Sequence, residues 1–435
     1  MKGVPRRARI AALVALGLIV VFGSASAGAT PGQASPESRP VIVSTITVGT
    51  TPVAGVVMVA SRNGAEVGRG TSGKDGSVEV VLPAGGQYEV TIDRSTLPKG
   101  VVFASGARTT LKPFVQASGR APVVFQLERK GAAEASSPGD STRLLNLLLS
   151  GLRFGLVIAL GSVGLSLLYG TTGLTNFAHG ELVTFGAVAA WFFNDPATFG
   201  LPLVAAGLLG LLASGLMGAT LEFSLFRPLR HRGMPTNAVM IVSIGLAFLL
   251  RYLISIVFEA NPRQYAQFAA QSPTVHLGPL DLRPKDLIVM AIAASVLVAV
   301  GVFLRRARLG TAIRAVSDNR DLAESSGIDV QRVILAVWVM SAGLAGLGGI
   351  LLGLTDTVSW NMGQRVLLVM FAAVVLGGLG TTFGAMAGGI IVGVVSDVST
   401  FWLDSDLKIV VALFTLILVL LVRPNGIFGF RERAA

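Results

Sequence analysis

The distribution of apolar and polar residues changes near residue 142. Beyond that point, long apolar runs alternate with short polar or charged segments, and runs of about 20 apolar residues can cross a bilayer as helices. Spans are predicted near residues 144–168, 173–193, 201–222, 237–258, 286–304, 333–354, 364–380, 383–400 and 406–422. We therefore expect residues 143–430 to form a polytopic α-helical membrane domain with about eight or nine transmembrane helices.

The pattern before residue 131 is of a different kind. Short β-type runs are separated by turn signals such as Asn63-Gly64. The runs cover residues 41–48, 54–61, 77–82, 88–92 and 123–127. This pattern predicts a small all-β sandwich over residues 40–130, between polar linkers at residues 28–39 and 131–142. Its turns resemble those of the carboxypeptidase-regulatory and transthyretin-like sandwiches.

The first 27 residues have the features of a secretory signal peptide. Lys2, Arg6 and Arg7 precede an apolar core, Ile10–Phe22, and small residues follow at positions 25–27. The core is shorter than the roughly 20 residues of a comfortable membrane span. A signal peptide over residues 1–27 is the prediction, and an uncleaved membrane anchor remains the alternative.

Basic residues indicate how the predicted spans are oriented, because Lys and Arg accumulate in cytoplasmic loops. Arg227–Arg232, Arg305–Arg332 and Arg423–Arg433 are the basic segments, so the C-terminus is predicted to be cytoplasmic. Counting back three spans from Arg227 places residue 143 outside, together with the β-sandwich. Between Leu354 and Arg423 an odd number of spans is required, which three short spans or one span with a re-entrant pair would satisfy.

Composition supports a multi-pass plasma-membrane protein and narrows its chemistry. Of the 435 residues, 52% are hydrophobic and 14% are charged, and the mean hydropathy is +0.70. The net charge of +11 comes mostly from basic residues that flank spans, so nucleic-acid binding is not expected. The chain has no cysteine and three well-separated histidines, and we predict no metal site and no cofactor. No P-loop, HExxH or GxSxG motif is present, so the chain is not expected to be an enzyme or to hydrolyse ATP itself.

Polar groups are concentrated in GTTGLTNFAHGE, residues 170–181, between two apolar runs. Polar backbone at membrane depth is tolerated where it lines a cavity, and broken helices expose groups that can bind polar solutes. The candidate path residues are Thr175, Asn176, Phe177, His179 and Glu181. The alternative is an ordinary turn, with Glu181 favoured by a helix N-terminus.

Charged residues also occur in or near other predicted spans, and their positions can be explained without a functional role. Arg251 lies within the span at 237–258, where it either extends toward the outer interface or lines a path. Asp397, Asp404 and Asp406 are expected to be solvated charges near the outer surface.

The basic segment Arg305–Arg332 must lie in water, because each charge would cost about 2.5–3.5 kcal/mol in hydrocarbon. It is also amphipathic, with Ile313 and Val316 on one side of a helix-like pattern. Leu322, Ala323 and Ile328 form a second apolar group. An ordered, amphipathic cytoplasmic loop predicts a docking surface for a cytoplasmic partner.

Glycine is dense in residues 376–389, LGGLGTTFGAMAGG. This density allows either close helix packing or a helix break.

Four segments of the apolar region carry a family resemblance. They are LTNFAHGELVTFGAVAA, LEFSLFRPLR, GTAIRAVSDNRDLAESSGIDVQRVI and AAVVLGGLGTTFGAMAGGIIVG. Together they resemble the branched-chain amino-acid ABC-importer permeases, which are related to ribose permeases. The resemblance covers about residues 145–430. Usual members of this family lack the exported β-domain that is predicted here. The family also includes importers of urea and short amides, so the resemblance alone leaves the substrate open.

The resemblance implies a transport subunit that acts with several partners. These would be a second, homologous or identical permease, two cytoplasmic ATPases and an extracytoplasmic substrate-binding protein. Asn176–Glu181 would lie by the translocation route, and Gly310–Asp329 would contact an ATPase. The residues implied in that contact are Gly310, Arg314, Ala315, Asp318, Ala323, Gly327 and Ile328.

The expected function is therefore translocation of branched-chain amino acids across the plasma membrane, with import of urea, short amides or other amino acids as the alternative. A membrane-anchored receptor would need one span rather than nine. A membrane enzyme would need a catalytic constellation that the sequence does not show. A channel or secondary transporter would not need an ordered cytoplasmic loop.

Overall fold

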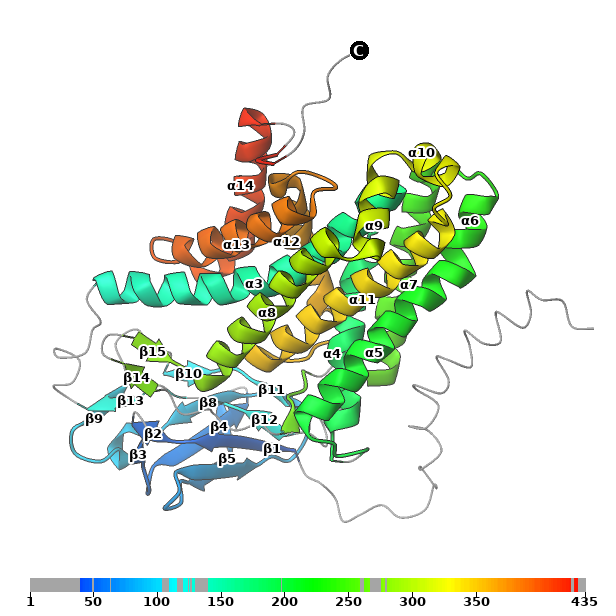
Figure 1. Cartoon of the computed structure of the whole chain (residues 1–435). Helices are drawn as coiled ribbons and strands as arrows, with labels where there is room; N and C mark the ends of the chain where they lie inside the picture. The colour runs from blue at the N-terminus through cyan, green and yellow to red at the C-terminus, as the bar shows by residue number, and fades with distance from the viewer. Residues whose placement is uncertain are drawn as a thin grey trace, which may run out of the picture. The chain divides into compact units, whose positions relative to one another are not determined.

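The structure is a computed structural model of the whole chain (Figure 1). It describes residues 40–48, 51–62, 64–103, 109–115, 120–123, 125, 127–129, 140–196, 198–258, 262–266, 275–277, 280–423 and 426–428. The predicted signal peptide, the linker at 28–39 and most of the linker at 131–142 lie outside these residues. The described residues before Gly139 form one compact unit, and those from Asp140 onward form a second.

The first unit is built of strands around one apolar core. Its strands are β1 (Val41–Thr45), β2 (Thr47–Val48), β3 (Thr51–Pro52), β4 (Val57–Arg62), β5 (Ala65–Thr71), β6 (Ser77–Val81), β7 (Gly86–Gln87), β8 (Glu89–Ile92), β9 (Val101–Phe103), β10 (Thr110–Leu111), β11 (Phe114–Val115), β12 (Arg120–Pro122) and β13 (Leu127–Arg129). They pair in the orders β12-β1-β6, β10-β8-β4-β5, β11-β7 and β3-β2-β13-β9. The β-rich unit is as predicted, while its classification as a sandwich stays a prediction.

Alternation of side chains explains this core. Ile42, Val78 and Val80 point inward from β1 and β6, and Val90 and Ile92 do so from β8. Successive residues of a strand face opposite sides, so one face of each strand is buried. The period-two pattern in the sequence therefore located β1, β2, β4, β6 and β8, while most of the shorter strands were not predicted.

Strand β5 was not predicted, because its sequence AEVGRGT is polar and contains two glycines. The glycines have a packing role. A Cβ on Gly68 would lie 2.9 Å from the Val81 carbonyl oxygen, and one on Gly70 would overlap the Glu79 carbonyl oxygen. Glycine at these positions allows the backbone of β5 to approach β6 closely.

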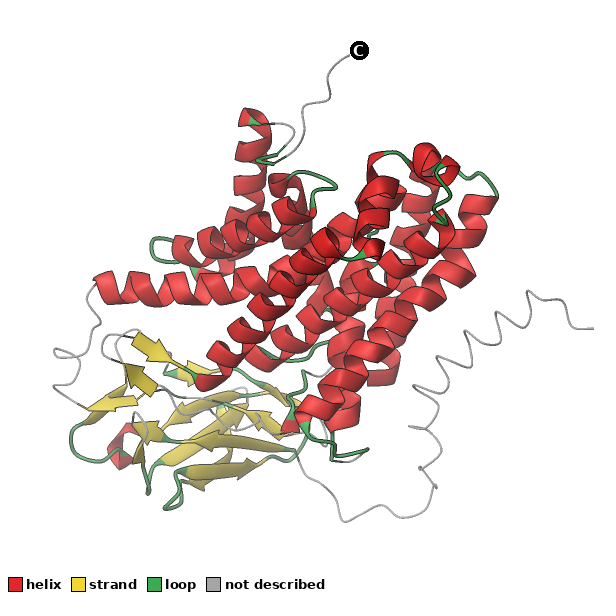
Figure 2. Cartoon of the chain, viewed as in Figure 1, coloured by secondary structure: helices red, strands yellow, loops and turns green. Residues whose placement is uncertain are grey.

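The second unit is helical apart from a small hairpin (Figure 2). Its long elements are α3 (Asp140–Thr172), α4 (His179–Asn194), α5 (Leu203–Leu221), α7 (Thr236–Phe258), α8 (Pro284–Arg306), α11 (Val330–Thr355), α12 (Met362–Gly377), α13 (Thr382–Ser399) and α14 (Lys408–Val422). Its short elements are the π-helical segment η3 (Glu222–Phe226), α6 (Arg227–His231), the strands β14 (Val275–Leu277) and β15 (Leu280–Leu282), α9 (Arg308–Asp318), α10 (Arg320–Ser325) and η5 (Ser405–Leu407).

Each predicted span corresponds to one helix, but not every helix has the length of a span. Within the described residues, 6 helices are long and apolar enough to cross a membrane, and α12 and α14 are shorter apolar helices. Helix α4 has 16 residues and is about 24 Å long, less than the roughly 30 Å hydrocarbon core. The chain is a multi-pass membrane protein, and the expected total of eight or nine crossings exceeds the number of helices that meet this criterion.

Glycine governs the contact between α3 and α13. A Cβ on Gly155 would lie 2.8 Å from the Cα of Ile390, and one on Gly389 would lie 2.6 Å from the Cα of Ala159. Any larger residue would push the helices apart, since real Cβ atoms do not approach so closely. These two helices, distant in sequence, therefore pack backbone to backbone.

The glycine-rich residues 376–389 both end a helix and allow close backbone packing. Gly378 and Gly380 have φ values of 105° and 78°, a region that favours glycine, and they end α12 before α13 begins. Added Cβ atoms on Gly377 and Gly384 would each overlap the other's backbone. Both alternatives raised by the sequence are thus realised, in a tight turn between two helices.

The prediction that Asp397 is a solvated rim charge is wrong. This residue is 4% exposed, its carboxylate accepts a hydrogen bond from Ser150 Oγ at 2.7 Å, and it pairs with Lys408. A buried carboxylate requires such partners because desolvation of an unpaired charge is costly. Asp397 therefore connects α13 with α3 and α14, whereas Asp404 is exposed as expected.

Candidate functional site

The connection between α3 and α4 does not turn at the end of α3 but folds back along it. Residues 173–178 are non-helical, beginning with Gly173 at φ 66°. His179, the first residue of α4, places Nε2 2.9 Å from the carbonyl oxygen of Gly161. Gly161 precedes the end of α3 by about three helical turns. The polar segment singled out in the sequence therefore lies inside the helical unit.

Side chains satisfy backbone donors of this non-helical segment. Asn176 Oδ1 accepts from the Ala178 N–H at 3.0 Å, and Thr172 Oγ1 accepts from the Leu174 N–H at 3.2 Å. Ser243 Oγ of α7 accepts from the Phe177 N–H at 3.1 Å. Irregular backbone at membrane depth needs such partners because lipid offers none. Ser243 was not predicted, since a lone serine in an apolar span gives no distinguishing signal.

His179 is fully buried and uses one ring nitrogen. A carbonyl oxygen only accepts, so Nε2 must carry the proton and the lone pair of Nδ1 remains as an acceptor. Nδ1 has no hydrogen-bond partner among the described residues, and the same is true of Asn176 Nδ2 and Glu181 Oε2. Buried polar atoms that lack a protein partner can interact with water or a polar solute.

Glu181 and Arg251 form a buried ion pair between α4 and α7. Glu181 Oε1 accepts from Arg251 Nη2 at 2.7 Å and from Nε at 3.0 Å. The side chains are 1% and 8% exposed, so the interpretation that Arg251 extends to the outer interface is wrong. Its positive charge compensates a carboxylate that hydrocarbon would otherwise reject.

Two helix N-termini meet beside this pair. The backbones of Gly180 in α4 and Gly363 in α12 are so close that a Cβ on either would overlap the other. The Gly363 N–H donates to Thr184 Oγ1 at 3.0 Å. Helix N-termini carry partial positive charge, which favours the nearby Glu181 carboxylate and would favour an anionic group of a solute. Of the predicted path residues, Asn176, His179 and Glu181 are fully or almost fully buried, while Thr175 and Phe177 are half-buried.

The amphipathic segment after α8 forms two helices, α9 and α10, as its pattern predicted. Gly310, Ile313, Val316 and Ala323 face inward. The other residues implied in the coupling contact lie at or near the surface: Arg314, Asp318 and Gly327 are exposed, and Ala315 and Ile328 are half-buried. Leu322 is an exception to its predicted apolar group, because it is 64% exposed.

Gly310 permits the sharp change of direction between α8 and α9. A Cβ there would lie 2.6 Å from the carbonyl oxygens of Phe303 and Leu304. Helix α9 can fold back against α8 only because position 310 lacks a side chain. Helix α9 also packs against α3 and α11, so it is joined to three long helices.

A cavity of about 440 Å³ lies where α9 meets the helical unit. Its lining includes Arg314 and Asp318 of α9, Thr171 at the end of α3, and Gly380 and Thr381 of the turn between α12 and α13. The cavity therefore joins two predicted coupling residues to two helix ends that are far apart in sequence.

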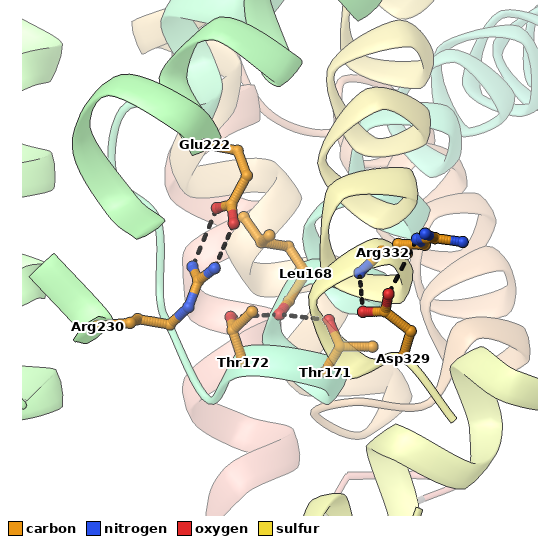
Figure 3. A network of polar contacts seen from close by, with 7 residues as sticks. All are labelled: Leu168, Thr171, Thr172, Glu222, Arg230, Asp329 and Arg332. Carbon is orange, nitrogen blue, oxygen red and sulfur yellow. Dashed lines mark hydrogen bonds and ion pairs between the residues drawn. The ribbon is translucent and has the colours of Figure 1, made fainter. Parts of the chain in front are cut away.

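Polar contacts at this end of the unit order the helix termini (Figure 3). Arg230 faces Glu222 in a two-point pair, with Nη1 3.0 Å from Oε2, and Glu222 is 1% exposed. Asp329 Oδ1 accepts from the Arg332 N–H at 3.0 Å and caps α11. Glu222 was missed by the sequence interpretation, although a carboxylate in an apolar run near a downstream arginine is a usable signal.

Comparisons with known proteins identify the family of this chain. The sequence model of the family "Branched-chain amino acid transport system / permease component" matches residues 147–421. The high-affinity branched-chain amino acid transport system permease protein LivH of Salmonella typhimurium is 31% identical over 301 residues, which cover 66% of this chain and 96% of LivH. The corresponding protein BraD of Pseudomonas aeruginosa is 29% identical over 300 residues, covering 66% of this chain and 96% of BraD.

A third relative is less similar. The probable branched-chain amino acid transport permease protein LivH of Methanocaldococcus jannaschii is 27% identical over 286 residues, covering 63% of this chain and 89% of the relative. No solved structure matches the chain. The family model covers more than half of the chain, including the folded-back segment, the buried ion pair and both helices of the amphipathic segment, so the chain belongs to the family of permease components of branched-chain amino acid transport systems.

Proposed function

We propose that this chain is the membrane-spanning permease subunit of an ATP-binding-cassette importer for branched-chain amino acids. The observation that carries the proposal is the continuous family match over residues 147–421, which includes the polar segment and α9–α10. The substrate is proposed from the names of the relatives LivH and BraD, which are branched-chain amino acid permeases and match over 89–96% of their length. These names do not favour the urea and short-amide alternative.

The proposed partners are a second permease, two ATPases and a substrate-binding protein. ATP hydrolysis is assigned to the separate ATPases. The docking surface for an ATPase would be the exposed part of α9–α10, with Arg314 and Asp318 as polar contacts and Leu322 as an apolar anchor. Anchors of this kind, an apolar side chain surrounded by charges, are typical of protein interfaces.

Force transmission follows from how α9 is held. Closure of the ATPases would displace α9, which packs against α3, α8 and α11 and lines a cavity with the turn between α12 and α13. The glycines in that turn allow backbone rotation. We infer that this displacement tilts the long helices and alternates access to the polar segment at residues 175–181.

The polar segment is proposed as part of the translocation route. Unpartnered acceptors and donors on His179, Asn176 and Glu181 would contact the polar end of the amino acid. The two helix N-termini at Gly180 and Gly363 would favour its carboxylate.

The β-rich unit is proposed to be an extracytoplasmic sandwich, and the α9–α10 segment and the C-terminus to be cytoplasmic. The absence of cysteine from the chain makes this orientation easy to test. A membrane-impermeant maleimide should label Ser95→Cys in intact cells and Ser325→Cys only after permeabilisation. The reverse labelling pattern would contradict the proposed orientation.

The function is tested by co-reconstituting the chain with its proposed partners in proteoliposomes. We expect uptake of radiolabelled L-leucine that requires ATP and the binding protein. Uptake without ATP would contradict the ABC-importer assignment, and uptake of urea in place of leucine would reverse the substrate assignment.

A further inference from the structure

A second cavity lies at the end of α11 opposite to the α9–α10 segment. It has a volume of about 520 Å³, within the usual range for small-molecule sites of about 300–1,000 Å³. Helix α11 has 26 residues, so its two ends are separated by about 39 Å. This cavity is therefore distinct from the one lined by Arg314 and Asp318, and it was not anticipated from the sequence.

Most of the wall is apolar, and one part of it is polar. The apolar lining residues are Phe154, Leu352, Met362, Val366, Val369 and Ile409. The polar part consists of Asp356, Thr357, Ser359, Arg365 and Lys408. Such a division suits a small solute that has one charged end and one hydrocarbon end.

Two opposite charges in the cavity are not paired with each other. Among the described residues, neither Asp356 nor Arg365 forms an ion pair. Arg365 Nη2 donates to Asn361 Oδ1 at 2.7 Å and to Ser359 Oγ at 3.2 Å, and both acceptors are neutral. These bonds orient the guanidinium and leave its other nitrogens available to an anion.

Lys408 is not available in the same way. It pairs with Asp397, and its ammonium lies 4.0 Å from the centre of the Phe154 ring. The charges of Lys408 and Asp397 cancel, as do those of Asp356 and Arg365. The cavity is thus neutral overall but divided into a positive and a negative part, which matches a zwitterion better than a simple anion or cation.

The helix ends reinforce this division. Asp356 follows the last residue of α11, at the helix end that carries partial negative charge, and Arg365 lies in the first turn of α12, where the partial charge is positive. Each side chain lies at a helix end whose partial charge has the same sign as its own charge. The fields of helix and side chain therefore add, attracting a cation at Asp356 and an anion at Arg365.

The segment that carries the polar groups is held in place. Val358 exchanges two backbone hydrogen bonds with Arg263, each 2.8 Å long. Ser359 is 5% exposed, and its backbone oxygen accepts from the Met362 N–H at 3.1 Å. A preorganised wall lowers the entropic cost of binding a small solute.

We propose that this cavity receives a zwitterionic amino acid with an apolar side chain: Arg365 and the start of α12 bind its carboxylate, Asp356 and the end of α11 bind its ammonium, and Val366 and its apolar neighbours pack against its hydrocarbon. The inference rests on the proposed function, which supplies a branched-chain amino acid as the solute. It adds a second amino-acid contact within the permease, besides the one proposed at residues 175–181, and in addition to the binding protein.

The test measures binding of free L-leucine to the complete permease–ATPase complex in nanodiscs, without the binding protein. Arg365→Gln and Asp356→Asn should each weaken binding about tenfold, as expected for loss of a charge-assisted hydrogen bond. Arg365→Lys should retain part of the affinity. Arg283→Gln and Asp404→Asn are matched controls, since both residues are exposed and flank helices at the same end, and they should leave binding unchanged.

Ligand analogues test the assignment on the unmodified complex. Leucinamide lacks the carboxylate and should bind about tenfold more weakly, with no further loss in Arg365→Gln. The acid 4-methylpentanoate lacks the ammonium and should be insensitive to Asp356→Asn. Sensitivity of both analogues to both substitutions would overturn the assigned polarity of the site.

Uptake by the intact importer separates failure of this inference from failure of the proposed function. If wild-type uptake of leucine is present but free leucine does not bind, or binds equally to wild type and both variants, the cavity is not an amino-acid site and the function stands. If wild-type uptake is absent, the proposed function itself is wrong. A change only in delivery by the binding protein would show that the cavity is a docking surface instead.

Discussion

Removal of Arg251 tests the energetic role of the buried ion pair. In Arg251→Met the carboxylate of Glu181 would remain, 1% exposed, without the guanidinium that donates to it at 2.7 Å and 3.0 Å. Breaking a buried pair by removing one partner typically costs about 3–5 kcal/mol, because it leaves an uncompensated charge. We expect Arg251→Met to lower the free energy of unfolding by about this amount.

The double variant Glu181→Gln with Arg251→Met should recover much of that loss, because no buried charge remains. The matched control is Arg153→Met. Arg153 pairs with Asp286 at 2.7 Å, but the side chains are 21% and 22% exposed, so solvent screens the charges. For this control we expect a loss of about 1 kcal/mol or less.

The assay is equilibrium unfolding of the purified chain in mixed micelles. Wild type, Arg251→Met, Glu181→Gln, the double variant and Arg153→Met are compared under one condition. The coupling free energy from the double-mutant cycle isolates the pair. A loss in Arg251→Met no larger than in Arg153→Met would refute the reasoning. Equal losses in the single and double variants would show that packing of the Arg251 stem, and not charge, is responsible.

Ala315→Pro should abolish leucine uptake while membrane insertion persists, because proline in the middle of α9 costs about 3 kcal/mol and breaks the helix; normal uptake would disprove coupling through α9. Asn176→Leu should reduce flux or alter selectivity in an assembled complex, since it removes the Oδ1 acceptor of the Ala178 N–H, and wild-type uptake would assign the segment a structural role alone. Gly389→Leu should destabilise the chain by about 1–3 kcal/mol or more in thermal unfolding, because α3 would be displaced, whereas Gly245→Leu, with open space around its Cβ, should have little effect. Deletion of residues 40–130 behind the signal tests the β-rich unit: a loss of uptake would give it a transport role, and full uptake would make it accessory.

Local patterns predicted the elements whose environment is uniform along their length. Long apolar runs located the long helices α3, α4, α5, α7, α8, α11, α12, α13 and α14, because lipid and protein interior both accept apolar side chains. The amphipathic pattern located α9, where Ile313 and Val316 are buried as expected. Lengths were less certain: α3 begins at Asp140, inside the predicted linker, and has 33 residues.

These local patterns did not predict contacts between residues that are distant in the sequence. The sequence raised Glu181 and Arg251 separately, and gave no reason to join them, because they come from different helices. Asp397 was assigned to solvent because its partners Ser150 and Lys408 lie on other helices. The cavity between α11, α12 and α14 was missed for the same reason, since Asp356 and Arg365 face one space only after the helices have packed.

The sequence by itself determined the membrane location, the division into β-rich and helical parts, the helical character of the basic segment and the family resemblance. These depend on hydropathy, period and motif, which are local properties of the chain. Only the tertiary structure decided that the polar segment folds back along α3, that Arg251 neutralises Glu181 inside the helical unit, and that opposite charges face each other across a cavity. The physical reason is that burial turns a charge from a solvated group into one that must find a partner, and the packed helices decide which partner is within reach.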